Sequence, residues 1–204
     1  MGGPTSSDYS CVVMIPRLAI FARYPTPGVA KTRLIPAIGA DAAARVHRRL
    51  VEYTVMAARQ SGLAFEMRVT GAPISAFTDW LGGDVALVEQ GDGDLGARLA
   101  RVPAPAIVIG SDAPGLTAAT LAEAAAALRT HAAVIGPALD GGYTLLGYRE
   151  PVPFAFEGMA WSTDTVFAET MHRLRTHGIA PLVLPMLADI DRPEDLLDWP
   201  ELLA

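Results

Sequence analysis

The sequence has little of what marks secreted, membrane-spanning or nucleic-acid-binding proteins. Its single cysteine, Cys11, excludes a disulfide framework and a cysteine-based zinc site, which suits a reducing cytoplasm. No run of about 20 uninterrupted apolar residues occurs, so no segment predicts a transmembrane helix. Acidic residues outnumber basic ones by 22 to 16, and the net charge of -6 lacks the basic field typical of nucleic-acid binders.

Lysine is also scarce, because Lys31 is the only lysine among the 16 basic residues. It lies in "FARYPTPGVAKTRL" (21–34), a segment that also carries Arg23 and Arg33. Two prolines fix φ and Gly28 tolerates a positive φ, so this loop can hold a set shape over the end of a strand. Such a loop is a candidate phosphate clamp at the protein surface, and the alternative is a solvated basic turn. It matches neither a GxGxxG turn nor a Walker A loop.

Length and composition predict one globular domain. With 204 residues, 51% of them hydrophobic and 19% charged, the chain can bury a full core. We expect that domain to span residues 14–204, with Met14 as a plausible start. Residues 1–13 have no basic n-region and only a short apolar stretch, so we expect an extension or an expression remnant rather than a signal peptide.

Short apolar strand patterns alternate with longer helical patterns along the whole chain. This alternation predicts a three-layer α/β domain, an αβα sandwich around a mainly parallel mixed sheet. The expected strands are 17–22, 64–70, 85–90, 106–112, 132–138, 142–149 and 180–187, and the expected helices are 41–62, 73–82, 94–102, 117–131, 162–178 and 192–203. In such sheets ligands bind at the carboxyl ends of the strands, so the loops that leave them are the places to search.

The segment "IVIGSDAPGLT" (107–117) places polar residues at one of these strand ends. Gly110 and Ser111 precede Asp112, whose carboxylate would lie at the edge of the sheet. Mg²⁺ or Mn²⁺ takes oxygen ligands from one or two carboxylates and from substrate phosphates, so Asp112 is a candidate metal ligand. The alternative is a turn residue that bonds its own backbone.

The segment "GPALDGGYTLLG" (136–147) carries a second polar turn. Gly141 and Gly142 permit close approach of a ligand to the backbone, with Asp140 and Tyr143 beside them. Taken alone, the pattern is that of an ordinary hairpin turn.

The segment "LADIDRPEDL" (187–196) supplies two more carboxylates after a strand. Asp189 and Asp191 point to the same side of an extended chain. Asp191 also fits the N-cap of the next helix, with Glu194 completing a capping box, so Asp189 is the freer metal ligand.

Other residues carry weaker signals. Trp161 either lines a pocket or belongs to the core. None of the four histidines has a second histidine or a cysteine at ligand spacing, and we expect surface or helix-end positions for His47, His131, His172 and His177.

Six motifs in a fixed order resemble one family from about residue 17 onward. They are "FARYPTPGVAKTRL", "GDLGARL", "IGSDAPGLT", "GPALDGGYTLLG", "WSTDTV" and "DIDRPEDL". The order resembles the DUF2064 proteins, which have the glycosyltransferase-A-like fold of the nucleotide-diphospho-sugar transferases. Two of the motifs are also similar to those of 2-phospholactate and molybdenum-cofactor guanylyltransferases.

The resemblance implies a role for each motif. The first loop would hold the nucleotide phosphates through Lys31 and Arg33, and Asp112 would bind the metal with Asp189 or Asp191. The DGGY turn would face the donor or the acceptor. The implied nucleotide site is Arg23, Gly28, Lys31, Arg33, Gly110 and Ser111, and the implied substrate residues are Gly141, Gly142, Tyr143 and Trp161.

Two reactions and one inactive form agree with these motifs. In glycosyl transfer from a nucleoside-diphosphate sugar, a metal on Asp112, together with Lys31, would neutralise the diphosphate leaving group, and Asp140 would be the candidate base. In nucleotidyl transfer, the same residues would stabilise an NTP while an acceptor phosphate or carboxylate attacks the α-phosphorus. An inactive nucleotide-binding protein is the third alternative. We favour glycosyl transfer to a small-molecule acceptor in the cytoplasm, and the sequence leaves the oligomeric state open.

Overall fold

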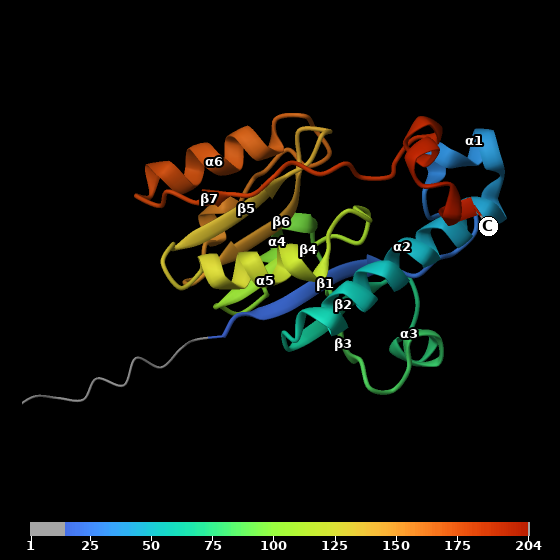
Figure 1. Cartoon of the computed structure of the whole chain (residues 1–204), viewed down its shortest axis with the longest axis horizontal. Coiled ribbons are helices and arrows are strands. Elements are labelled where there is room, and N and C mark those ends of the chain that lie inside the picture. The colour runs from blue at the N-terminus through green and yellow to red at the C-terminus, as the bar shows by residue number, and fades with distance from the viewer. Residues whose placement is uncertain (1–14, 204) are drawn as a thin grey trace, which may run out of the picture.

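A computed structural model describes residues 15–203 (Figure 1). The prediction for residues 1–13 therefore lies outside the described residues. Seven strands form one sheet in the order β3-β2-β1-β4-β6-β5-β7. The strands are β1 Arg17–Arg23, β2 Phe65–Thr70, β3 Ala86–Glu89, β4 Ala106–Ile109, β5 Ala133–Pro137, β6 Tyr143–Tyr148 and β7 Leu182–Val183. The α-helices are α1 Ile35–Ile38, α2 Ala40–Ser61, α3 Ile74–Leu81, α4 Leu95–Leu99, α5 Ala118–Ala127 and α6 Val166–Thr176.

Helices cover both faces of the sheet, which confirms the predicted three-layer sandwich. On one face, side chains of α2, α3 and α5 pack against β1, β2 and β4 in a core that includes Ile20, Val55 and Leu121. On the other face, α4 and α6 pack against the same sheet around Val108 and Leu174. Alternate residues of a strand point to opposite faces, so buried strands need apolar residues at every position.

Strand direction brings the polar loops together. β1 pairs in parallel with β2 and with β4, while β6 runs antiparallel between β4 and β5. The loops that leave β1 and β4 therefore lie at the same edge of the sheet. The start of β6 meets the end of β4 there, because Ile109 is paired with Leu145.

The C-terminal part differs from the sequence prediction. The expected strand 180–187 contributes only the two residues of β7 and an isolated bridge between Ala138 and Leu187. The expected helix 192–203 is a pair of 3₁₀ helices, Pro193–Asp198 and Pro200–Leu203. Pro200 explains the break, because proline lacks the N–H and clashes with the preceding turn of an α-helix.

A third apolar cluster holds this C-terminal segment in place. Ile190, Leu196 and Leu202 pack against Leu34 and Leu50, so the end of the chain lies beside α1 and the start of α2 (Figure 1). This packing brings the segment around Asp191 next to the first loop. Within the part of the chain that the structure describes, no helix is both long and apolar enough to cross a membrane.

Candidate functional site

A polar cavity of about 880 Å³ lies where the first loop, the end of β4 and the C-terminal segment meet. Its lining includes Arg23, Lys31 and Arg33 from the first loop and Asp112 from the end of β4. Other charged residues of the lining include Asp140, Asp189, Asp191 and Arg192. The structure thus brings together the cations and carboxylates that the sequence placed in four separate motifs. We refer to this space as the polar cavity.

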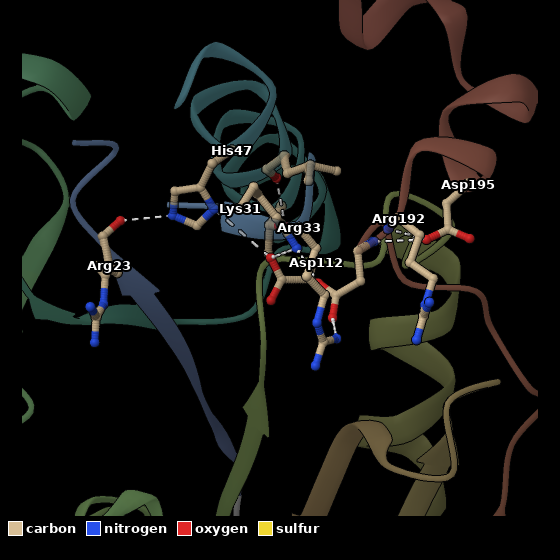
Figure 2. Close-up of polar contacts among 10 residues, drawn as sticks. Arg23, Lys31, Arg33, His47, Asp112, Arg192 and Asp195 are labelled. Carbon is tan, nitrogen blue, oxygen red and sulfur yellow. Dashed lines mark hydrogen bonds and ion pairs between the residues drawn. The ribbon is translucent and has the colours of Figure 1, made fainter. Parts of the chain in front are cut away.

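An ion cluster around Lys31 lies among the residues that line the polar cavity (Figure 2). Lys31 Nζ lies 2.7 Å from Asp112 Oδ1 and donates a hydrogen bond of 3.0 Å to Asp191 Oδ1. Arg33 Nη1 donates to the other oxygen of Asp191 at 2.8 Å. The Lys31 side chain is only 5% exposed, whereas Asp112 is 46% exposed and Arg33 61% exposed. Lys31 is therefore the buried member of the cluster.

Burial and charge act in opposite directions on these groups. Burial alone would lower the pKa of Lys31, but the carboxylates of Asp112 and Asp191 outweigh burial and raise it. Burial would likewise raise the pKa of Asp112, yet the Lys31 ammonium lowers it below its ordinary value. Both groups are charged at neutral pH, because each stabilises the ionised form of the other.

Two expectations about this cluster are wrong. The sequence predicted Lys31 at the surface, but its ammonium is enclosed by the two carboxylates. The sequence also predicted Asp191 as a helix cap with Glu194. Instead, Asp195 Oδ2 accepts the backbone N–H groups of Asp191 and Arg192, at 2.9 and 2.7 Å. The Asp191 carboxylate is consequently available to the cavity.

A backbone contact fixes the distance between the two carboxylate segments. The N–H of Ile190 donates to the carbonyl of Asp112 at 2.9 Å, and the Ile190 side chain is fully buried. Asp112 and Asp191 are therefore neighbours although they are far apart in the sequence. Hydrophobic periodicity alone gives no information on such a contact.

His47 was not expected in the site. It lies in α2, is 6% exposed and shares the polar cavity with Asp112. Its Nε2 donates to the carbonyl of Arg23 at 2.9 Å, which leaves Nδ1 as an acceptor 3.9 Å from Asp112 Oδ1, without a hydrogen-bond partner (Figure 2). Burial lowers the pKa of His47, so the ring is neutral at pH 7. The sequence feature that could have indicated the burial of His47 is its position on the apolar stripe of α2, between Ala43 and Val51.

A second cavity of about 370 Å³ adjoins the first and differs from it in character. Apolar side chains form much of its wall, among them Phe21, Leu99, Val108 and Trp161. Asp112, Asp140, Asp189 and Asp191 line both cavities, and no lysine, arginine or histidine of residues 15–203 lines the second. We refer to this space as the apolar cavity.

The DGGY turn separates β5 from β6 at the junction of the cavities. Asp140 Oδ1 accepts the N–H of Gly142 at 2.8 Å, and Gly141 has a φ of 87°. A Cβ on Gly141 would collide with the backbone of Asp164, so the close approach here is made by the chain itself, just before α6. The sequence had suggested a ligand in that position.

The other residues that the sequence assigned to the site lie partly in the apolar cavity and partly outside it. Tyr143 and Trp161 both line the apolar cavity; burial raises the pKa of the Tyr143 hydroxyl, and Trp161 Nε1 is buried without a partner. Gly110 lines the same cavity, whereas Ser111 is buried. Gly28 adopts the expected positive φ of 80°.

The carboxylates have the right chemistry for a divalent cation. Burial, with the carboxylates of Asp140 and Asp191 nearby, raises the pKa of Asp189, so a cation there would relieve a real repulsion. The unpartnered Nδ1 of His47 adds a further acceptor beside Asp112. Among residues 15–203 no three such side chains already converge at metal-ligand distances, and Lys31 lies between two of them. The donors therefore have the chemistry that a divalent cation requires, and two of them, Asp112 and Asp191, are paired with Lys31 in this structure.

A family model described as an uncharacterized protein conserved in bacteria (DUF2064) matches residues 53–163. The chain belongs to the DUF2064 family. The matched region contains Asp112, the DGGY turn and Trp161, whereas Lys31 and Asp191 lie outside it. A comparison with curated proteins finds no match.

Solved structures share the fold. A protein of Desulfovibrio desulfuricans G20, provisionally named a nucleotide-diphospho-sugar transferase, is 28% identical with a TM-score of 0.81, over 91% of this chain and 87% of that one. Rv0371c of Mycobacterium tuberculosis H37Rv, in complex with manganese, is 20% identical with a TM-score of 0.55, over 92% and 98%. CMP:2-keto-3-deoxy-manno-octonic acid synthetase, in complex with CTP, is 15% identical with a TM-score of 0.55, over 92% and 98%. These comparisons confirm the nucleotide-diphospho-sugar transferase fold.

Proposed function

We propose that this protein is a metal-dependent transferase that moves a glycosyl group from a nucleoside-diphosphate sugar to a small-molecule acceptor. The observation that carries the proposal is the pair of adjoining cavities with shared carboxylates. One contains cations suited to a diphosphate. The other has apolar walls and an acidic rim, which suit an acceptor without negative charge. The names of the solved structures with this fold, transferases that use nucleotides, support the class of reaction.

Lys31, Arg33 and Arg23 would bind the phosphates of the donor. Arginine matches phosphate oxygens with a planar fork and lysine with a compact charge, so the loop supplies both kinds of contact. Asp112, with Asp189 and Asp191, would hold Mg²⁺ or Mn²⁺, and manganese is present in one protein of the same fold. When bound, the cation neutralises charge on the diphosphate leaving group.

Asp140 would act as the base. Its Oδ1 is engaged by the N–H of Gly142, and the residue lies at the rim of both cavities. In the reaction, the bond between the anomeric carbon and the diphosphate oxygen breaks and a bond to the acceptor oxygen forms. The hydroxyl proton passes to the Asp140 carboxylate, and the nucleoside diphosphate leaves.

Nucleotidyl transfer is the second candidate, favoured by the number of cations in the polar cavity. Arg23, Lys31, Arg33 and Arg192 all line it, and a triphosphate has more charge to balance than a diphosphate. An anionic acceptor would then have to share this cavity with the triphosphate, because no cation among the described residues lines the apolar one.

A thermal-shift panel of NTPs and nucleoside-diphosphate sugars with Mn²⁺ identifies the donor, because a ligand in excess stabilises the fold by RT ln(1+[L]/Kd). With the donor known, ³¹P NMR distinguishes the reactions by their products, nucleoside diphosphate for glycosyl transfer and pyrophosphate for nucleotidyl transfer. Asp112→Asn should abolish turnover with the fold intact, and normal metal-dependent turnover of that variant would refute the assignment of Asp112.

A further inference from the structure

The position of Lys31 has a consequence for metal binding. Its ammonium contacts Asp112 Oδ1 at 2.7 Å and Asp191 Oδ1 at 3.0 Å, and these are two of the carboxylates that would hold the cation. The backbone contact between Ile190 and Asp112 keeps the two segments together. A positive charge therefore already lies between the carboxylates of the free protein.

The local backbone is built to place this charge. Lys31 has a φ of 50° and a ψ of 48°, a left-handed conformation that is uncommon for a residue other than glycine. Its carbonyl accepts the N–H of Leu34 at 2.9 Å in the 3₁₀ helix Thr32–Leu34. The chain uses arginine for all its other basic residues, but only the compact ammonium of a lysine resembles a small cation.

We propose that the Lys31 ammonium serves as a resident counter-ion that competes with the divalent cation for Asp112 and Asp191, and that a nucleotide phosphate frees these carboxylates by drawing Lys31 away. The first part concerns the free protein, and the second part rests on the proposed function. In this scheme Lys31 couples the binding of metal to the binding of nucleotide.

The coupling follows from charge. A divalent cation cannot share Asp112 and Asp191 with the ammonium at the same distances without strong repulsion. A phosphate in the polar cavity offers Lys31 other oxygens, since Lys31, Arg23 and Arg33 line the same space. Nucleotide should thus strengthen metal binding, and metal should strengthen nucleotide binding by the same factor, because such coupling is reciprocal.

The first test measures Mn²⁺ binding by EPR, without nucleotide, in wild type, Lys31→Met and Arg33→Met. Methionine keeps much of the length of Lys31 and removes the charge. We expect Lys31→Met to bind Mn²⁺ at least about tenfold more tightly than wild type, within the usual range of such couplings. Among residues 15–203, Asp191 is the one carboxylate paired with Arg33, and the Arg33 side chain is exposed. The Arg33→Met control should therefore stay within about threefold of wild type. Binding by Lys31→Met that is no tighter than that of wild type would overturn the counter-ion role.

The second test measures calorimetrically how much Mn²⁺ strengthens the binding of ADP, CDP, GDP and UDP. Chelation of Mn²⁺ by the nucleotide is the same for both proteins, so it cancels in the comparison. For the nucleotide that binds, we expect the strengthening to be at least about fivefold larger in wild type than in Lys31→Met. Equal factors in the two proteins would overturn the transfer of Lys31 to the phosphate.

A third measurement needs no variant, in case Lys31→Met does not fold. Because Lys31 is the only lysine, lysine labelled with ¹⁵N at Nζ gives one side-chain NMR signal from the chain. We expect this signal to shift, and its protons to exchange faster with water, when Mg²⁺ and the nucleoside diphosphate are added together. A signal that stays unchanged at saturation would refute the displacement of Lys31.

These results separate the inference from the proposed function. If no nucleotide binds but Lys31→Met gains Mn²⁺ affinity, the proposed function fails and the counter-ion role stands. If wild type binds a nucleoside-diphosphate sugar but Lys31→Met gains no Mn²⁺ affinity, the proposed function stands and the counter-ion role fails.

Discussion

Removal of the Lys31 charge should destabilise the protein in the absence of metal and nucleotide. Breaking a buried ion pair from one side costs about 3–5 kcal/mol, and an exposed pair contributes less than about 1 kcal/mol. The Asp112 Oδ1 atom is buried, but much of that side chain reaches water, and Asp191 keeps its hydrogen bond to Arg33. For Lys31→Met we therefore expect a loss of about 2 kcal/mol in the free energy of unfolding, or about 4–8 °C in Tm.

The assay is urea unfolding in the presence of EDTA. It is monitored both by fluorescence and by circular dichroism, because coincident transitions verify two-state unfolding. Arg33→Met is the control, with an expected loss below about 0.5 kcal/mol. In an Asp112→Asn background the loss caused by Lys31→Met should shrink by about 1 kcal/mol or more, because a neutral amide needs no counter-ion. An equal loss in both backgrounds would show that the cost comes from packing and not from charge.

Three further predictions follow from buried groups and turns. Asp189→Asn should raise the free energy of unfolding at pH 7, because the raised pKa of Asp189 means that its charge is disfavoured in the folded state. The control Asp198→Asn, at an exposed position, should change it little, and a loss of stability in Asp189→Asn would contradict the crowding of carboxylates. The lowered pKa of His47 means that the unfolded state binds more protons than the folded state, so the free energy of unfolding should fall as the pH is lowered from about 6.5 to 5. The fall should be smaller in His47→Gln, and equal slopes of unfolding free energy against pH in the two proteins, measured by urea titration, would refute this. Gly141→Ala should lower Tm more than Gly28→Ala, for which we expect a loss of about 1 kcal/mol. Both glycines have a positive φ, but of the two only an added Cβ at Gly141 would collide with backbone atoms. Equal losses of Tm in thermal melts would exclude the steric role.

Periodicity in the sequence predicted most of the fold. The alternation of buried strands with amphipathic helices gave the layers, and the expected helix 41–62 corresponds closely to α2. The prediction of one closing helix was wrong because Pro200 falls inside it, and a proline cannot continue an α-helix whatever the apolar pattern around it. The expected strand 180–187 was too long, because pairing with β5 extends over only two residues, Leu182 and Val183.

The candidate site was predictable in its residue types but not in its contacts. Motif order placed Lys31, Asp112 and Asp191 at one edge of the sheet. The enclosure of Lys31 depends on the backbone bond between Ile190 and Asp112, which leaves no trace in a local pattern. His47 shows the same limit, because a histidine on an apolar stripe is assigned to the site only when the strand that faces it is known.

The proposed transfer from a nucleotide sugar is tested most directly by the calorimetric affinity of wild type for one nucleoside in four forms, in the presence of Mn²⁺. The forms are the monophosphate, diphosphate, triphosphate and diphosphate sugar of the nucleoside that gives the largest thermal shift. We expect affinity to rise from monophosphate to diphosphate, to gain nothing further in the triphosphate, and to be retained in the diphosphate sugar. Tightest binding of the triphosphate, with no binding of any nucleoside-diphosphate sugar, would contradict glycosyl transfer.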